Sequence, residues 1–315
     1  MNTLVLLAPG QIELRDIPIP EIGEDEVLVR VRACNIDRMT FDQFSGSQQR
    51  NGAVTPLFGV AGTGIVTSTG SEVNEFTSGD RVVFWGGVSV YSEYCNVSTS
   101  RLYHLPEQVG FEEGTAVHLF PEIIRGIEQS QPAEQTVFIS GAGSVGILCA
   151  QICRAYGVGR IIISDLYDQR LRRAQHIAAD VTINASTEDV VRRIQEETEE
   201  QGVDICMECS GEGDGFRNGE AVLQTGGRLV VMGRHTEPAS LDLADWADRS
   251  LTLVMAREQS DETRQLVEKG LQLIDLGMVE LRPLLTHVFP FHRATDAFEL
   301  IRDQPGRTLT VTLQP

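Results

Sequence analysis

Thr136-Val-Phe-Ile-Ser-Gly-Ala-Gly-Ser-Val-Gly146 is the stretch that decides the fold of this chain. Its first five residues are mostly apolar and β-branched, which predicts a short buried strand. Glycines follow at once, and the weakly charged residues 147–155 predict a helix packed on that strand. A strand, a glycine-rich turn and a helix in this order are typical of a dinucleotide-binding unit.

The glycines and the start of the helix predict how a dinucleotide binds. Gly141 allows a tight turn, Gly143 lets a pyrophosphate approach the backbone, and Gly146 lets helix and strand pack closely. The backbone N–H groups around Ser144 and Val145 then face the phosphates, where the helix dipole favours negative charge. The motif alone is a weak signal, so the neighbouring sequence has to support it.

An acidic residue follows the next predicted strand at the expected spacing. The apolar run 160–164 predicts that strand, and Asp165 ends it. A carboxylate there accepts hydrogen bonds from the 2′-hydroxyl of an adenosine ribose and repels a 2′-phosphate, which favours NAD over NADP. We expect Arg170 to lie against the same ribose. The competing interpretation of Asp165 is a solvated helix cap.

Composition limits the class of protein. The 315 residues, 41% of them hydrophobic, predict two domains with a large buried core. The net charge of −19 disfavours nucleic acid or an anionic membrane as a partner. No run is long enough to span a membrane and no signal peptide is evident, so we expect a cytoplasmic protein. The six cysteines do not suggest a disulfide framework.

The pattern of predicted elements changes along the chain. Strands separated by proline and glycine are predicted first, at 3–7, 12–15, 27–33, 81–84 and 90–97. The glycines of 57–69 predict tight turns or close backbone packing. A helix over 110–129, broken near Pro121, precedes an alternation of strands and helices, which predicts a parallel sheet covered on both faces.

The alternating elements continue to the end of the chain. The strands are predicted at 136–140, 160–164, 181–184, 203–208, 228–232 and 251–255. The helices between them are predicted near 145–156, 167–178, 187–199 and 213–224. A helix over 261–277, a strand over 285–289, a helix over 292–303 and a strand over 308–313 are expected to return to the β-rich domain.

Six further segments resemble the medium-chain dehydrogenase/reductase superfamily, in the same order along the chain. They are Pro20–Arg30, Gly79–Val82, Val90–Tyr94, Asp204–Gly211, Gly226–Gly233 and Leu285–Phe289. With the glycine motif and Asp165, the resemblance covers nearly the whole chain and is greatest to the alcohol and polyol dehydrogenase branch.

The resemblance implies a fold and a site. It implies a Rossmann-type doubly wound parallel sheet over 122–255 and a β-rich GroES-like substrate domain built from 1–121 and 256–315. It places the nicotinamide in a cleft near Cys34 and His118. It also implies coenzyme contacts from Ser210, Gly233 and Arg307, and assembly into a homodimer or homotetramer.

The chain departs from that family at the residues that bind zinc. Cys34 stands where relatives have their first zinc ligand, but Gly59-Val60-Ala61 replaces Gly-His-Glu, and Ile36 replaces the serine or threonine that relays the alcohol proton. The structural-zinc lobe is missing, and Gly86-Gly87 bridges its place. We therefore expect no standard catalytic zinc. The alternative is an unusual site in which Cys34 and His118 are joined by Asp37 or Glu122.

We expect an NAD-linked transfer of hydride to or from a secondary alcohol, polyol or sugar-like substrate. Without zinc, oxidation of an alcohol requires a general base. His118 is the first candidate because its ordinary pKa is near neutral, followed by Asp37 and then Tyr91. The competing interpretations are a hydrogen-bonded structural histidine at 118 and a small buried residue at Cys34.

Two other functions remain open at this point. One is reduction of an activated C=C bond, as in the zinc-free quinone and enone reductases, for which the loss of zinc ligands is natural. The other is a non-catalytic protein that senses NAD. The partner in each case is a small molecule.

Overall fold

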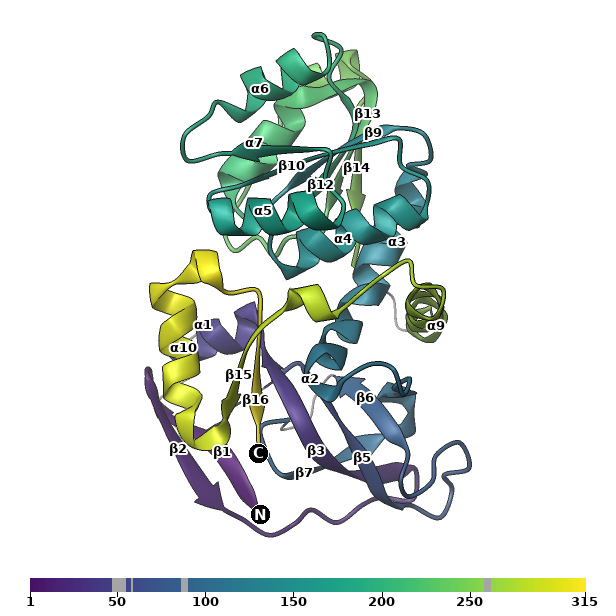
Figure 1. Cartoon of the computed structure of the whole chain (residues 1–315), viewed down its shortest axis with the longest axis vertical. Helices are drawn as coiled ribbons and strands as arrows, with labels where there is room; N and C mark the ends of the chain where they lie inside the picture. The colour runs from purple at the N-terminus through teal and green to yellow at the C-terminus, as the bar shows by residue number, and fades with distance from the viewer. Residues whose placement is uncertain (47–54, 58, 86–89, 258–261) are drawn as a thin grey trace. The chain divides into compact units, whose positions relative to one another are not determined.

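The computed structural model of the chain describes residues 1–46, 55–57, 59–85, 90–257 and 262–315 (Figure 1). Gly86 and Gly87, the predicted bridge, lie outside the described residues, as does most of the polar stretch before Thr55. The chain forms two compact units. The first is Met1–His118 with Leu281–Pro315, and the second is Leu119–Glu280.

The second boundary between the units differs from the expected one. The helix α9 (Thr263–Asp275) was expected in the β-rich domain, but it belongs to the second unit because it packs on α3 (Phe120–Ser130). Gly270 lies so close to the Phe120 ring that a Cβ there would collide with it. The chain therefore returns to the first unit at Leu281 rather than at 256.

The second unit is built on one parallel six-stranded sheet. Its strand order is β11-β10-β9-β12-β13-β14. The strands are β9 (Thr136–Ser140), β10 (Arg160–Asp165), β11 (Val181–Asn184), β12 (Val203–Glu208), β13 (Leu223–Val231) and β14 (Thr252–Met255). Every neighbouring pair is parallel. This is the doubly wound order predicted from the sequence, and the strand order reverses at β9.

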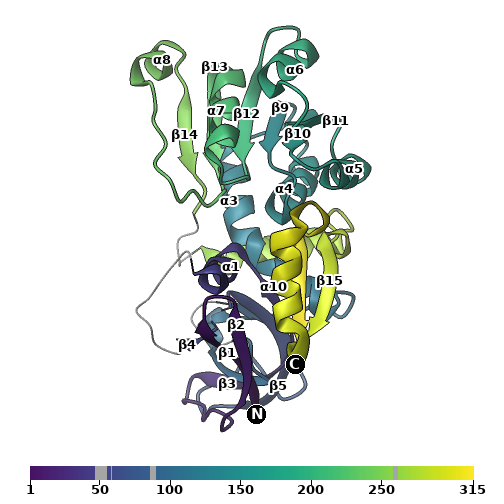
Figure 2. The ribbon, with the colours of Figure 1, turned by 90° about the vertical axis from the view of Figure 1, so that its left-hand side faces the viewer.

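Helices cover both faces of that sheet (Figure 2). One layer contains α3, α4 (Ser144–Ala155) and α5 (Asp168–Ile177), which contact one another in that order. The other contains α6 (Val190–Glu197) and α7 (Gly213–Val222), and α8 (Leu243–Asp248) precedes β14. The middle residues of β9 are fully buried because both faces are covered.

The first unit is β-rich, as predicted. One sheet runs β15-β16-β3-β5-β6-β8 with β7 also paired to β3, and a smaller sheet runs β2-β1-β4. The larger sheet contains β3 (Glu26–Ile36), β5 (Ala61–Thr69), β6 (Arg81–Trp85), β7 (Tyr94–Ser98), β8 (Leu102–His104), β15 (Leu285–Pro290) and β16 (Thr310–Gln314). The smaller contains β1 (Asn2–Ala8), β2 (Gln11–Asp16) and β4 (Thr55–Pro56).

Short helices complete the first unit. They are α1 (Arg38–Ser45), α2 (Phe111–Gly114), α10 (Ala294–Asp303) and the 3₁₀ turns η1 (Thr99–Arg101), η2 (Thr115–Leu119, whose last residue belongs to the second unit), η3 (Arg282–Leu284), η4 (Phe291–Arg293) and η5 (Pro305–Arg307). The sequence did not predict α1. The helix predicted over 110–129 is three pieces, and Pro121 sits in the first turn of α3, where proline is tolerated.

The glycines of 57–69 serve close packing inside a strand. A Cβ on Gly64 would collide with the Arg30 carbonyl oxygen of β3, and one on Gly62 would lie 2.8 Å from the Phe84 ring of β6. The segment is therefore the strand β5, and the predicted close backbone packing is confirmed. No described helix combines the length and the apolar character needed to cross a bilayer.

Candidate functional site

The glycine turn lies between β9 and α4, where the sequence places it. Gly141 has a φ of +99°, which glycine adopts readily, and its N–H donates to the Ser164 carbonyl at 2.8 Å. A Cβ on Gly146 would collide with the Gly141 carbonyl oxygen, so only glycine allows this approach of helix and turn. The turn is held by β10 on one side and by α4 on the other.

The N-terminus of α4 is open to an anion. Its N-cap is Gly143, which has no side chain to cap the helix, and the first turn carries no acidic residue. The N–H groups of Val145 and Gly146 point out of the helix start without an acceptor in the helix. A Cβ on Gly143 would meet only Nη1 of Arg170, 3.9 Å away. Backbone donors, the helix dipole and a nearby guanidinium thus favour a phosphate here.

Asp165 is the last residue of β10, beside that turn. It is only 9% exposed, and its carboxylate accepts the Ala142 N–H at 2.8 Å on Oδ2 and the Tyr167 N–H at 3.0 Å on Oδ1. These bonds orient the carboxylate, and a carboxylate has capacity for further donors such as ribose hydroxyls. The solvated helix cap is not what the structure has, because the N-cap of α5 is Tyr167.

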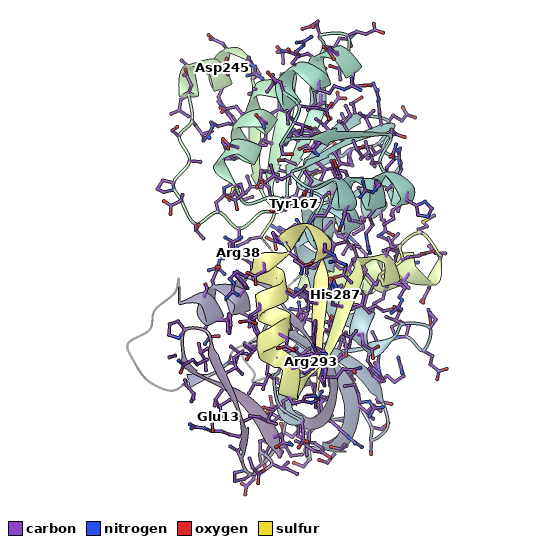
Figure 3. The ribbon with its side chains drawn as sticks, turned by 60° about the vertical axis from the view of Figure 1, so that its left-hand side comes forward. Glu13, Arg38, Tyr167, Asp245, His287 and Arg293 are labelled. Atoms are coloured by element: carbon purple, nitrogen blue, oxygen red, sulfur yellow. The ribbon has the colours of Figure 1, made fainter. Side chains whose placement is uncertain are left out.

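Arg170 lies between Asp165 and the glycine turn. Its Nη1 is 3.6 Å from Oδ2 of Asp165, and its guanidinium lies over the Tyr167 ring, 5.3 Å from the centroid. Figure 3 labels Tyr167 at the start of α5. The structure thus brings Arg170 to the same edge of the sheet as Gly143 and Asp165, and its contact with the ribose stays a prediction.

Two more predicted coenzyme residues lie on the other side of β9. Ser210 follows β12 and Gly233 follows β13, the next two strands of the sheet. A Cβ on Gly141 would lie 3.0 Å from the Ser210 backbone nitrogen, and one on Gly233 would collide with the Gly211 nitrogen. The turns after β9, β12 and β13 therefore pack directly together.

Sequence reasoning missed Glu208 and His235 at this edge. Glu208 ends β12 and is fully buried, and its Oε2 lies 2.7 Å from Nε2 of His235. An acidic residue at the end of an apolar strand was the available signal for Glu208. No local signal pairs it with a histidine in the turn after another strand.

Cys34 lies in the core of the first unit. It is 0% exposed, it pairs with Gly62 and Leu313 in the sheet, and its Sγ donates to the Leu313 carbonyl at 3.4 Å. Burial raises the pKa of this thiol well above its usual value. A protonated thiol of this kind is a weak nucleophile and a weak metal ligand, which favours a structural role.

His118 has one ring nitrogen bonded to the backbone. Its Nδ1 lies 2.6 Å from the Thr115 carbonyl oxygen, and because a carbonyl only accepts, Nδ1 carries the proton. In the neutral ring Nε2 is then the acceptor. Desolvation lowers the pKa of His118 below its ordinary 6.5, although the Thr115 bond and the charge of Asp37 oppose this. The ring is therefore neutral at pH 7 and able to take a proton.

The other two predicted bases have structural partners. Asp37 is the N-cap of α1, and its Oδ1 accepts the Thr40 N–H at 2.8 Å and the Thr40 hydroxyl at 2.7 Å. Tyr91 is fully buried, and its hydroxyl donates to the Asn35 carbonyl at 2.6 Å. Desolvation raises the pKa of Tyr91 well above its usual value, which disfavours it as a proton carrier.

The absence of a standard catalytic zinc stays a prediction, which the residues at the expected ligand positions support. Val60 and Ala61 offer no ligand atom, and Gly59 is packed against Val90 and Tyr91. Across the residues that the structure describes, no three His, Cys, Asp or Glu side chains gather in a group that could hold a metal. Cys34, Asp37 and His118, the members of the unusual set that belong to the first unit, form no such group.

The predicted site residues fall into two groups. The glycine turn, Asp165, Arg170, Ser210 and Gly233 lie together at the carboxyl edge of the sheet in the second unit. Cys34, Asp37 and His118 belong to the first unit. Arg307 also belongs to the first unit, where it is exposed and donates to Oε1 of Gln304 at 2.7 Å, so its pyrophosphate contact stays a prediction.

Two protein families match the two parts of the chain. The family described as "Alcohol dehydrogenase GroES-like domain" matches residues 23–118, and the one described as "Zinc-binding dehydrogenase" matches residues 144–273. An L-threonine 3-dehydrogenase of Bacillus subtilis is 26% identical over 95% of this chain and 94% of its own length. A sorbitol dehydrogenase of Rattus norvegicus is 25% identical over 99% of this chain and 96% of its own.

Solved structures share the fold over the whole length. A putative zinc-binding dehydrogenase from Sinorhizobium meliloti, bound to NADP, superposes with a TM-score of 0.86 at 23% identity, covering 100% of this chain and 99% of its own. An alcohol dehydrogenase from Escherichia coli, complexed with NADH, gives a TM-score of 0.86 at 21% identity with the same coverage. At these identities the likeness shows the fold.

Proposed function

The chain belongs to the medium-chain dehydrogenase/reductase superfamily, among the alcohol and polyol dehydrogenase-like proteins, and we propose that it transfers hydride between NAD(H) and a secondary alcohol, polyol or sugar-like substrate. The observation that carries the proposal is the glycine turn with Asp165 beside it. Oxidoreduction of an alcohol or polyol with a nicotinamide dinucleotide is the activity of the family. The choice of NAD and the independence of zinc belong to the proposal.

Asp165 supports NAD over NADP. Its carboxylate is held by two backbone N–H groups at the place where the adenosine ribose is expected, and it disfavours a second negative charge. Nη1 of Arg170 is 3.6 Å from that carboxylate, so the negative charge of Asp165 already balances the positive charge of Arg170. Relatives of the fold are known with either coenzyme, and this pair of residues makes the distinction testable.

The chain's own residues would bind and orient the coenzyme. The N-terminus of α4 holds the pyrophosphate, Asp165 the adenosine ribose, and the turns containing Ser210 and Gly233 the other ribose. When bound, the nicotinamide supplies the hydride chemistry. His118 takes the hydroxyl proton on Nε2, since Nδ1 is committed to Thr115.

We propose that this chemistry needs no zinc. Val60 and Ala61 carry no ligand atoms, and Cys34 is a buried thiol bonded to a backbone carbonyl. A base then replaces the metal in removing the proton. The same residues also suit a reductase of activated C=C bonds, which is the second candidate function, and a non-catalytic NAD sensor is the third.

A panel assay separates the candidates. NADH formation is measured with the purified, metal-analysed protein on secondary alcohols, polyols and sugars, with and without a chelator. NADH consumption is measured in parallel on enones. Chelator-resistant turnover is the expected result. Chelator-sensitive turnover would mean that a metal site forms, turnover on enones alone would select the second candidate, and tight NADH binding without turnover would select the sensor.

We also propose a homodimer or homotetramer that pairs through the second unit. Among the described residues its edge strand β14 pairs only with β13, and its Leu253 and Met255 are 39% and 60% exposed. Exposed apolar edge strands are usually covered in native proteins, and a second copy of the same strand covers one symmetrically.

A further inference from the structure

Glu208 is a buried carboxylate that binds two turns at once. Its Oε1 accepts the N–H groups of Ser210 at 2.8 Å and Gly211 at 3.0 Å and the Ser210 hydroxyl. Its backbone carbonyl accepts the N–H groups of Met232 at 2.9 Å and Gly233 at 2.8 Å. One residue thus fixes the turn after β12 and the turn after β13.

His235 completes this arrangement from the second turn. A carboxylate oxygen only accepts, so Nε2 of His235 donates to Oε2 of Glu208 across 2.7 Å and carries the proton. The ring also meets the Phe216 ring edge-on, with centroids 5.9 Å apart. The side chain is 18% exposed, so the imidazole is held on two sides and reaches the surface on another.

The stability of the fold does not explain why a carboxylate, that of Glu208, is buried at the end of β12. A fully buried carboxylate costs free energy unless several donors satisfy it, and apolar residues of the same volume often stabilise a core equally well. Here the donors to the carboxylate are the Ser210 and Gly211 N–H groups of the turn after β12 and His235 of the turn after β13. A buried polar network of this kind fixes one geometry for the groups it joins.

We propose that Glu208 and His235 are positioning residues that shape the turns after β12 and β13 into the receptor for the nicotinamide half of the coenzyme. The proposal rests on the proposed coenzyme function. The order of the strands indicates which half of the coenzyme lies against these two turns. Asp165, at the adenosine ribose, ends β10 on one side of β9, whereas Glu208 ends β12 on the other side, and a dinucleotide places its two halves across that reversal.

The test compares a whole coenzyme with its adenosine half. Affinities for NADH and for ADP, which lacks the nicotinamide and its ribose, are measured by calorimetry on the full chain and on His235→Leu. Losing a hydrogen bond to a charged group is expected to weaken NADH binding about tenfold or more. ADP affinity should stay within about twofold, because its adenosine and pyrophosphate contacts involve other residues. A purely structural defect would weaken both ligands alike.

Three further variants make the result decisive. His235→Gln restores a donor near the position of Nε2 and should recover most of the NADH affinity. Glu208→Gln removes the acceptor charge that both turns share and should lose at least as much as His235→Leu. His176→Leu replaces an exposed histidine of α5 and should change neither affinity. Thermal melting of each variant identifies any that fails to fold, and the remaining ones still decide.

The outcomes separate this inference from the proposed function. An equal loss of NADH and ADP affinity in His235→Leu, or no loss at all, would overturn the positioning role while leaving the coenzyme assignment intact. A wild-type chain that binds neither ligand would overturn the coenzyme assignment and the inference with it.

Discussion

Asp165 is the residue on which coenzyme choice depends. Its carboxylate is fixed by the Ala142 and Tyr167 N–H groups, and Arg170 is close enough to respond to its charge. A neutral side chain of the same shape would keep an acceptor for the ribose but would no longer repel a 2′-phosphate. Arg170 would then be available to bind that phosphate.

Asp165→Asn is therefore expected to shift the preference toward NADP. The efficiency kcat/KM with NAD should fall roughly tenfold, as for a weakened hydrogen bond, while kcat/KM with NADP rises. Steady-state kinetics with both coenzymes measures the ratio. Adding Arg170→Leu to the variant should remove the gain with NADP, and an unchanged ratio in Asp165→Asn would contradict the assignment.

His118 determines the acid limb of the pH profile if it is the base. Only the neutral imidazole accepts a proton, so kcat/KM should fall as the pH drops through the pKa of His118. Desolvation lowers that pKa below 6.5. His118→Gln should lower kcat roughly 100-fold, abolish that limb and leave NADH affinity unchanged. A variant with full turnover would return the role to Asp37 or to water.

At the scale of elements, the β9–turn–α4 unit uses its glycines for different purposes. A Cβ on Gly146 would collide with the protein itself, whereas a Cβ on Gly143 would meet only the end of the Arg170 side chain. Gly146 therefore serves the packing of helix on strand. Gly143 leaves space that the protein does not use, which is the space assigned to the pyrophosphate.

Alanine at Gly143 should affect mainly NADH binding, whereas alanine at Gly146 should affect mainly the free energy of unfolding. Gly143→Ala should cost less than about 1 kcal/mol of unfolding free energy, as for a weakened N-cap, yet weaken NADH binding at least about tenfold. Gly146→Ala should cost about 1–3 kcal/mol through overpacking. Denaturant unfolding and NADH titration measure both. Normal NADH affinity in a folded Gly143→Ala protein would refute the pyrophosphate site.

At the scale of the whole molecule, the exposed apolar edge of β14 is the feature that a single copy does not explain. Leu253 and Met255 lie on a strand whose far side has no partner among the described residues. A charge placed on such an edge is a common way for proteins to prevent strand pairing.

Leu253→Lys is expected to convert the assembly into monomers or lower-order species. Light scattering coupled to size exclusion gives the mass of each variant. Leu276→Lys, at a leucine after α9 that is 61% exposed against 39% for Leu253, is the matched control and should leave the mass unchanged. A monomeric wild-type chain would rule out the proposed oligomer.

The sequence by itself predicted the parallel sheet of the second unit and the glycine turn and Asp165 of the proposed site. The strand, the glycine turn, the helix and Asp165 lie within thirty or so residues, and their signals are local: glycine at a positive φ, apolar runs, and an acidic residue at a strand end. The predicted strands there match β9 to β14, apart from the longer β13. The family resemblance added Ser210 and Gly233 by motif.

Only the tertiary structure decided the remaining features, because they depend on contacts between distant segments. Glu208 meets His235 across the carboxyl ends of two strands, and α9 joins the second unit through Phe120. Burial by the surrounding sheet turns Cys34 and Tyr91 from candidate reactive groups into packed core residues. The packing of the whole unit decides which side chains are buried and which residues they contact. No periodic pattern in the sequence predicts those contacts.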